Sequence, residues 1–150
     1  MKNFEPKIVA MVCTYCTYTA ADMAGSMRLQ YPSNVRIVKL PCTGTVDVIH
    51  ILKTFQAGAD AVMVSGCEVG DCHFLEGNLR AKERVEHAKE LLDEAGIGGE
   101  RLEMYHVGAS DAPLWVVRVN EMVERVKKLG PNPLSEVRAK RAHAQEEARA

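Results

Sequence analysis

The chain has no long apolar run and few aromatic residues, and its charges nearly cancel. Only 5% of its 150 residues are aromatic, and 19 basic against 20 acidic side chains give a formal net charge of −1. Such a chain has no broad positive field for binding nucleic acid or an anionic membrane. No stretch approaches the roughly 20 apolar residues of a transmembrane helix, and the polar N-terminal residues do not resemble a secretion signal. We therefore expect a cytoplasmic protein.

Motifs that mark common enzyme classes are also missing. The sequence contains no G-x-G-x-x-G dinucleotide fingerprint, no phosphate-binding P-loop and no G-x-S-x-G nucleophile elbow. It offers no evident acid–base pair or activated nucleophile. We therefore expect no substrate turnover by the side chains alone, so that the chemistry would come from a bound group that the protein positions and tunes.

Apolar, β-rich runs alternate with helical patterns along residues 1–131. The strand-like runs cover residues 7–12, 35–41, 59–66 and 102–107, and the helical patterns cover residues 19–29, 47–58, 77–95 and 112–129. This alternation is typical of a parallel sheet with helices on its faces. We predict one α/β domain, a four-stranded parallel sheet with flanking helices, flavodoxin-like or related.

A different composition follows the helix-stopping residues Gly130-Pro131-Asn132-Pro133. Residues 132–150 are rich in alanine and charge, and Val137 is the only large apolar residue after Ser135. Such a segment cannot form a core of its own. Two interpretations stay open: a charged, frayed C-terminal tail, or a helical docking arm that orders against a partner protein.

Cysteine is the most informative residue type, because all five cysteines fall where a predicted strand ends. Cys13 and Cys16 follow the first strand, Cys42 follows the second, and Cys67 and Cys72 follow the third. The carboxyl ends of parallel strands share one edge of the sheet, where open α/β sheets bind ligands. We expect the five thiols to converge at this edge.

The convergence of thiols predicts a metal centre. Thiolate is a soft ligand that selects iron–sulfur clusters, zinc or Cu(I), and an iron–sulfur cluster usually takes four thiolates. Four of the five cysteines are therefore expected to bind, although the spacing does not say which four. Neighbouring glycines let backbone N–H groups approach the sulfur atoms, and nearby hydroxyls are further candidate donors: Thr14, Thr17, Thr43 and Thr45.

Two other functions fit part of the same pattern. Zinc also accepts four thiolates, which would make the chain a structural zinc-binding adaptor between enzyme subunits. The Cys13-x-x-Cys16 spacing suits a thiol–disulfide oxidoreductase, which would leave the other three cysteines without a role. Iron and acid-labile sulfide content separates both alternatives from an iron–sulfur protein.

Two histidines and one charged helix face are weaker candidates. His73 follows Cys72 directly and His106 lies in the fourth strand. With five thiols available, we expect both histidines to pack or to support the site rather than to bind metal. The helix after Cys72 carries a cationic face that is expected to be solvated, with contact to an acidic partner as the alternative: Arg80, Lys82 and Arg84.

Three stretches of the sequence resemble the delta (iron–sulfur) subunit family of methyl-viologen-reducing hydrogenase. They are CTYCTY at residues 13–18, GSMRLQYPSNVR at residues 25–36 and GCEVGDCHFLEGN at residues 66–78. The resemblance extends over residues 7–131, nearly the whole predicted domain. It implies a [2Fe–2S] protein in which the family's cysteines fall on Cys13, Cys16, Cys42, Cys67 and Cys72.

The same resemblance implies a non-catalytic electron-transfer subunit of an oxidoreductase complex, and it implies the partners of that subunit. Such proteins relay electrons between a hydrogenase or formate dehydrogenase module and a flavin-containing, heterodisulfide-reductase-type subunit, in hetero-oligomeric complexes that take part in flavin-based electron bifurcation. The sequence departs from the family pattern at Thr14-Tyr15, where Asn-Trp is common, at Thr45, where arginine is common, and at Glu68-Val69, where His-Pro is common. Losing a cation and adding a carboxylate beside a cluster lowers its reduction potential.

Overall fold

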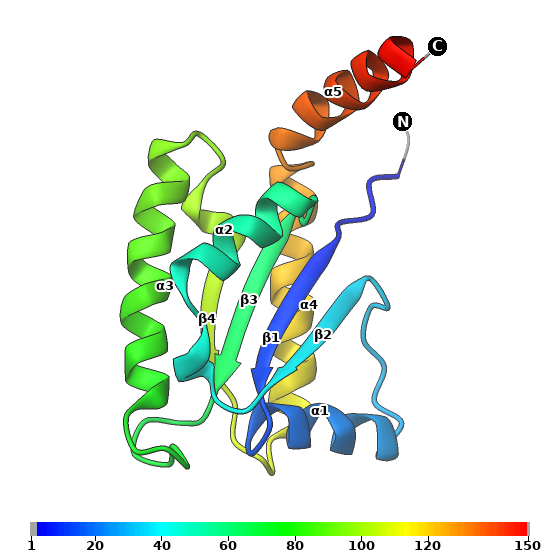
Figure 1. Ribbon diagram of the computed structural model, residues 1–150. Helices are drawn as coiled ribbons and strands as arrows, with labels where there is room; N and C mark the ends of the chain where they lie inside the picture. Colours follow the sequence, from blue (N-terminus) through cyan, green and yellow to red (C-terminus); the bar gives the residue numbers. More distant parts are fainter. Residues whose placement is uncertain (1–2, 150) are drawn as a thin grey trace.

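The computed structural model describes residues 3–149, which are arranged around one four-stranded sheet (Figure 1). All strand pairs are parallel and the strand order is β2-β1-β3-β4. The strands are β1 (Ile8–Cys13), β2 (Val35–Leu40), β3 (Ala61–Gly66) and β4 (Leu102–His106). This order corresponds to the first four strands of the flavodoxin-like order 2-1-3-4-5, which confirms the predicted α/β fold.

Helices cover both faces of the sheet and enclose two cores. α1 (Thr17–Ser26) and α4 (Ala112–Leu129) pack together on one face, while α2 (Val48–Ala57) and α3 (Gly77–Glu94) pack on the other. Trp115 is the largest fully buried side chain of the first core, and Phe55 is the largest of the second. Burial of these apolar faces is the main favourable term in folding.

Local signals explain where most helices begin and end. The Asp47 side chain accepts a bond from the third backbone N–H of α2, and the His50 side chain accepts one from the backbone N–H of Asp47. Gly58 then ends α2 with a φ of 115°, a conformation that glycine adopts without strain. Both boundaries were predicted.

Three predicted boundaries were wrong by a few residues. α1 begins at Thr17 rather than at residue 19, because the buried Thr17 hydroxyl contacts Ser65 Oγ at 3.1 Å and draws the first turn onto β3. It ends at Ser26 rather than at residue 29, because Arg28 adopts a left-handed φ of 56°. β3 starts at Ala61 because the carboxylate of Asp60 is already bound to the backbone N–H groups of Lys7 and Asn132.

The amino-terminal edge of the sheet is closed by a buried cation. Arg101, in the short 3-10 turn η2 (Gly99–Arg101), is only 5% exposed. Its guanidinium donates to five backbone carbonyl oxygens, those of Asp60, Ile97, Leu129, Gly130 and Pro131. Leu129 is the last residue of α4 and the next two residues follow it, so this one side chain fixes where the chain leaves the domain.

The chain then continues into α5 (Leu134–Arg149), which projects from the end of the sheet opposite to the strand carboxyl ends (Figure 1). None of its residues is buried. Its backbone is helical, and its role as a docking arm for a partner stays a prediction. No helix within residues 3–149 is long and apolar enough to cross a membrane.

Candidate metal centre

The five cysteines meet at the carboxyl-terminal edge of the sheet, as predicted. Cys13 is the last residue of β1 and Cys16 is the N-cap residue of α1, whereas Cys42 lies between β2 and the short turn η1 (Thr43–Thr45). Cys67 directly follows β3, and Cys72 lies in the loop that leads to α3. The five side chains form one cluster in which Cys16 is partly exposed and the other four are buried.

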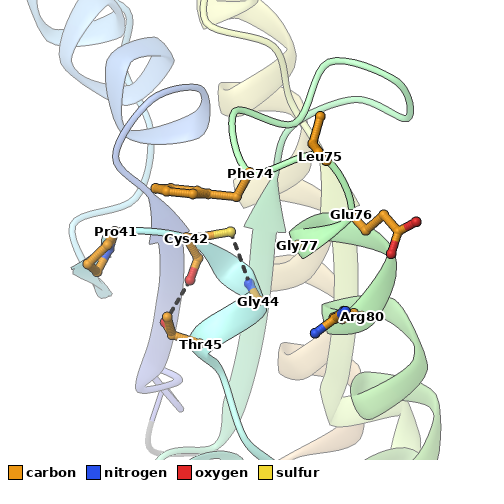
Figure 2. Close-up of a pocket in the computed structure, with 9 residues that line it drawn as sticks. All are labelled: Pro41, Cys42, Gly44, Thr45, Phe74, Leu75, Glu76, Gly77 and Arg80. Atoms are coloured by element: carbon orange, nitrogen blue, oxygen red, sulfur yellow. Dashed lines mark hydrogen bonds between the residues drawn. The ribbon is translucent and has the colours of Figure 1, made fainter.

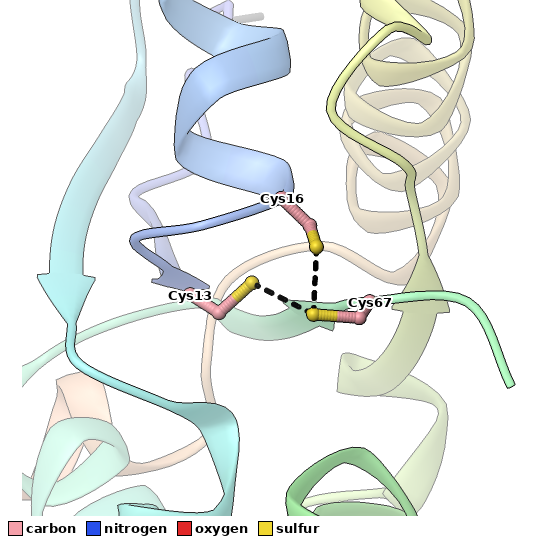
Figure 3. Close-up of side chains that lie close together, drawn as sticks. All are labelled: Cys13, Cys16 and Cys67. Carbon is pink, nitrogen blue, oxygen red and sulfur yellow. Dashed lines mark hydrogen bonds between the residues drawn. The ribbon is translucent and has the colours of Figure 1, made fainter. Parts of the chain in front are cut away.

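Three of the thiols form the tightest group (Figure 3). Cys67 Sγ lies 3.7 Å from Cys13 Sγ and 2.7 Å from Cys16 Sγ, and the three sulfur atoms lie within 4.8 Å of one another. Two thiolates on one tetrahedral metal with bonds of about 2.3 Å stand about 3.8 Å apart. The separation of Cys13 and Cys67 is therefore already that of two ligands of one metal ion.

Cys42 and Cys72 contact each other and complete the cluster over the first residue of α3. A Cβ atom built on Gly77 would overlap Cys42 Sγ and would stand 3.4 Å from Cys72 Sγ. A Cβ on Gly44 would in turn stand 2.9 Å from Gly77 Cα. Only glycines at these two positions let η1 and the start of α3 come close enough to place both thiols in the cluster.

Burial and neighbouring thiols keep most of these cysteines protonated. Burial is the largest effect that raises the pKa of Cys16, Cys42 and Cys67, and neighbouring thiols raise the pKa of Cys42 and Cys67 further. For Cys16 the hydrogen bond to Cys67 lowers the pKa, and Cys13 raises it. A coordinated metal ion deprotonates its thiol ligands outright. A cationic centre is therefore the kind of group that would hold these side chains as thiolates.

Cys72 behaves differently because backbone donors surround its sulfur atom. Burial opposes its ionisation, but backbone N–H groups of Asn78, Phe74 and Gly77, together with the Cys42 thiol, outweigh burial and lower the pKa of Cys72. Gly44 N–H likewise donates to Cys42 Sγ at 3.3 Å. Gly44 belongs to η1, and Gly77 and Asn78 belong to the first turn of α3, where donors have no partner within the helix. Phe74 lies in the loop before α3.

Two side chains whose roles the sequence did not predict hold the loops around the cluster. Asn78 is fully buried, and its Nδ2 donates to the carbonyl oxygens of Cys67 at 3.0 Å and Glu68 at 2.9 Å. Arg84 Nη1 donates to the carbonyl oxygens of Gly44 and Val46 at 2.6 and 2.9 Å. Arg84 therefore braces η1, although its place on the cationic face of α3 predicted a solvated side chain.

The histidines have the supporting roles that were expected. His106 Nδ1 lies 2.8 Å from the carbonyl oxygen of Cys67, so it fixes the same peptide group as Asn78. The His73 ring stacks on Tyr15 with a centroid separation of 3.9 Å. The sequence placed both histidines near the cysteines. The bond between His106 and the Cys67 carbonyl, in contrast, depends on the tertiary fold.

The expected hydroxyl donors are wrong at three positions. Thr14 Oγ1 donates to the carbonyl oxygen of Leu40 at 2.7 Å, and Thr45 Oγ1 donates to that of Cys42 at 2.6 Å. Thr17 Oγ1 contacts Ser65 Oγ instead of a sulfur atom. Carbonyl groups at the strand ends compete for these hydroxyls, and oxygen is a stronger acceptor than a thiol sulfur.

The cluster lies beneath an exposed apolar surface. Phe74 and Leu75 are 50% and 84% exposed, and the Phe74 ring meets Tyr15 edge-on at 5.8 Å. Beside them a cavity of about 650 Å³ opens next to Cys42 (Figure 2). Its other lining residues include Pro41 and Arg80. This surface gives the otherwise buried thiol cluster its apolar contact with the exterior.

Comparison with known proteins associates this fold and site with hydrogenase subunits. Residues 8–130 match the family described as methyl-viologen-reducing hydrogenase, delta subunit. An iron–sulfur subunit of the F420-non-reducing hydrogenase vhu from Methanocaldococcus jannaschii is 55% identical over 130 residues, which cover 87% of this chain and 97% of the relative. An iron–sulfur subunit of the F420-non-reducing hydrogenase from Archaeoglobus profundus is 42% identical over 130 residues, which cover 87% and 95%.

A longer relative contains a similar domain. It is a subunit of the ferredoxin/F(420)H(2)-dependent CoB-CoM heterodisulfide reductase from Methanosarcina acetivorans, and it is 35% identical over 130 residues. The alignment covers 87% of this chain but 16% of the relative. In that protein, a domain of this kind is one part of a much larger polypeptide.

Proposed function

The chain belongs to the methyl-viologen-reducing hydrogenase delta subunit family, and from this premise we propose that it is a [2Fe–2S] electron-transfer subunit of a hetero-oligomeric oxidoreductase complex. The observation that carries the proposal is the gathering of five thiols from three strand ends into one cluster. All the donor atoms are soft sulfur, which suits iron–sulfur ligation. A bound cluster would take up and release single electrons.

The chain's own residues would hold and shield the cluster. Four of the five cysteines supply the ligands in this proposal, and backbone N–H groups near Cys42 and Cys72 donate to their sulfur atoms. Hydrogen bonds to sulfur and exclusion of water both tune a cluster's reduction potential. The apolar surface around Phe74 would let a redox partner approach without exposing the thiols to solvent.

The proposed partners lie on either side of this relay. We place a hydrogenase or formate dehydrogenase module on one side and a flavin-containing, heterodisulfide-reductase-type subunit on the other, in a complex capable of electron bifurcation. The names of the relatives support the pairing, and so does the similar domain within the heterodisulfide reductase polypeptide of Methanosarcina acetivorans. A cytoplasmic location fits this role, because thiols stay reduced there.

The first test is the metal and sulfide content of protein purified without oxygen. We expect about two irons and two acid-labile sulfides per chain, with an EPR signal of a reduced [2Fe–2S] cluster after dithionite treatment. Stoichiometric zinc without sulfide would replace the relay by a structural zinc adaptor. Protein without either metal would favour a dithiol enzyme that uses Cys13 and Cys16.

Five single cysteine-to-serine variants test the ligand set. Serine keeps the size of the side chain but replaces the soft sulfur by a hard oxygen, so we expect four variants to lose most of the visible absorbance and one to retain it. The circular dichroism of each variant controls for folding. A dithiol enzyme makes a different prediction, because changes at Cys42, Cys67 and Cys72 would then leave thiol–disulfide exchange intact.

A further inference from the structure

A second surface of the molecule lies between α2 and α5. These helices border a groove of about 420 Å³. Its apolar residues are Ile49, Leu52, Leu134 and Val137, and its polar residues are Lys53, Gln56, Arg138 and Arg141. α5 lies beyond the amino-terminal end of the sheet (Figure 1), whereas the cysteines lie at the carboxyl-terminal edge.

The helix that forms one wall of the groove is an addition to the shared domain. The family match ends at residue 130, and α5 begins at Leu134. The alignment with the Methanocaldococcus jannaschii relative covers 97% of that protein but 87% of this chain. The α5 wall of the groove therefore lies outside the part that matches the family, whereas the α2 wall lies inside it.

Specific bonds hold α5 in place even though none of its residues is buried. Asn132 is 1% exposed, and its Nδ2 donates to the carbonyl oxygens of Phe55 and Ala59 at 3.1 and 2.8 Å. Asn132 Oδ1 accepts the backbone N–H of Leu134 at 3.0 Å, and Arg138 donates to the carbonyl oxygen of Ala57. The groove is therefore formed before anything binds to it, which lowers the entropic cost of binding.

The composition of the groove indicates what would fill it. Ile49 and Val137 are 49% and 45% exposed, so both walls carry apolar surface that a partner can cover. Three cations line the groove and none of the described lining residues is a carboxylate, although the whole chain has a net charge of −1. We propose that this groove docks an acidic, amphipathic segment of a partner protein.

Other occupants fit the groove less well. A second copy of this chain joined by a two-fold axis would bring the same cations face to face, because both copies present the same surface. An anionic membrane is favoured by clusters of about four to eight basic residues, more than the groove offers. A bound partner segment here would leave the cysteine edge free, so the groove would tether another protein at a distance from the proposed electron path.

Fluorescence anisotropy with two designed peptides tests the proposal on the full-length, metal-loaded protein. One labelled amphipathic peptide carries leucines on one helical face and glutamates on the other, and the second has lysine at every glutamate position. We expect the acidic peptide to bind and the basic one to fail. The double variant Lys53→Glu/Arg141→Glu should weaken binding of the acidic peptide by about tenfold or more, because attractions become repulsions.

A matched double variant on α5 serves as the control. Lys140→Glu/Arg149→Glu makes the same charge change on residues that do not line the groove, and it should alter the affinity by less than about twofold. Equal loss of binding in both variants, or no binding of the acidic peptide up to about 1 mM, would overturn the proposal. So would groove-dependent self-association or binding to phosphatidylserine vesicles in place of peptide binding. Iron content is measured on the same samples. Loss of iron would count against the proposed electron-transfer function and not against the docking groove.

Discussion

At the scale of single residues, Gly77 decides whether two of the cysteines can enter the cluster. A Cβ atom at this position would overlap Cys42 Sγ. The backbone at Gly77 also approaches Gly44 closely, because a Cβ atom built on Gly44 would stand 2.9 Å from Gly77 Cα. We expect Gly77→Ala to lose most of its bound iron and sulfide, measured by colorimetric assay on anaerobically purified protein.

Gly25→Ala is the control for this substitution. Gly25 lies in α1 with nothing within 4 Å of a built Cβ, so alanine there should keep the iron content and slightly favour the helix. If Gly77→Ala retained a full cluster with the wild-type EPR spectrum, Cys42 would not be held where the structure places it.

Sequence reasoning reached the cysteines but not the groups that support them. Strand ends determine where a thiol lies, so the convergence of Cys13, Cys42 and Cys67 follows from the order of apolar runs. The roles of Asn78 and Arg84 depend on which carbonyl groups lie opposite them after folding. Those partners are more than ten residues away along the chain or on another element, and no local pattern specifies them.

At the scale of elements, Glu103 on β4 joins two helices that lie on opposite faces of the sheet. Its carboxylate oxygens accept bonds from Lys89 Nζ on α3 and Arg125 Nη1 on α4, each at 2.9 Å. Burial opposes ionisation of Glu103, but these two cations outweigh it and lower the pKa of the carboxyl group. The edge strand thus has a bond to each helical layer.

The lowered pKa predicts a pH-dependent loss of stability in Glu103→Gln. A carboxylate with a depressed pKa contributes stability above its unfolded pKa of about 4.3, and this contribution is lost as the pH falls through the folded value. The three side chains are partly exposed, so we expect the variant to lose about 1 kcal/mol at pH 7. The difference from wild type should shrink progressively as the pH falls below about 4.3.

Urea unfolding of both proteins across this pH range measures the effect, and any change common to both proteins cancels in the difference. Glu121→Gln is the comparison variant, because Glu121 pairs with Arg118 on the exposed surface of α4 alone. It should change stability by less than Glu103→Gln at every pH. If the difference in unfolding free energy between wild type and Glu103→Gln stayed constant down to low pH, the lowered pKa of Glu103 would be wrong.

The elements themselves were largely predictable, and the exceptions have local causes. Periodicity located four strands and four helices, and the cap residues Asp47 and Gly58 set the limits of α2. The start of α1 was missed because the contact of Thr17 with Ser65 is a tertiary one. For α5 the composition suited a frayed tail and a helical arm equally, and the bonds of Asn132 that precede this helix join residues far apart in the sequence.

At the scale of the whole molecule, the two ends of the sheet serve different purposes. The carboxyl ends of the strands carry the thiol cluster, whereas the amino-terminal end carries the Arg101 network and α5 (Figure 1). The two cores lie between them. A change confined to one end of the sheet should therefore leave the structure of the other end intact. Two truncated chains test this expectation.

A chain that ends at Pro133 and a chain that ends at Gly130 differ by the three residues that include Asn132. The first keeps the bonds of Asn132 to Phe55, Ala59 and Asp60, so its melting temperature should stay close to that of the full chain. The second leaves these buried groups unpaired and should lose about 2 kcal/mol, or roughly 5–10 °C in melting temperature.

Calorimetry and iron analysis of both truncated proteins distinguish the two ends. We expect both to retain iron and sulfide, because neither cut approaches the cysteines. Both should lose the acidic peptide, because each removes the α5 wall of the groove. Loss of iron in the chain that ends at Pro133 would mean that α5 supports the cluster, and the division of the molecule into a redox end and a docking end would be wrong.

The melting temperatures test the Asn132 bonds separately. If the two truncated chains melted at the same temperature, the bonds of Asn132 would not contribute to stability. The contacts of Arg101 would then be the ones that stabilise the amino-terminal edge of the sheet.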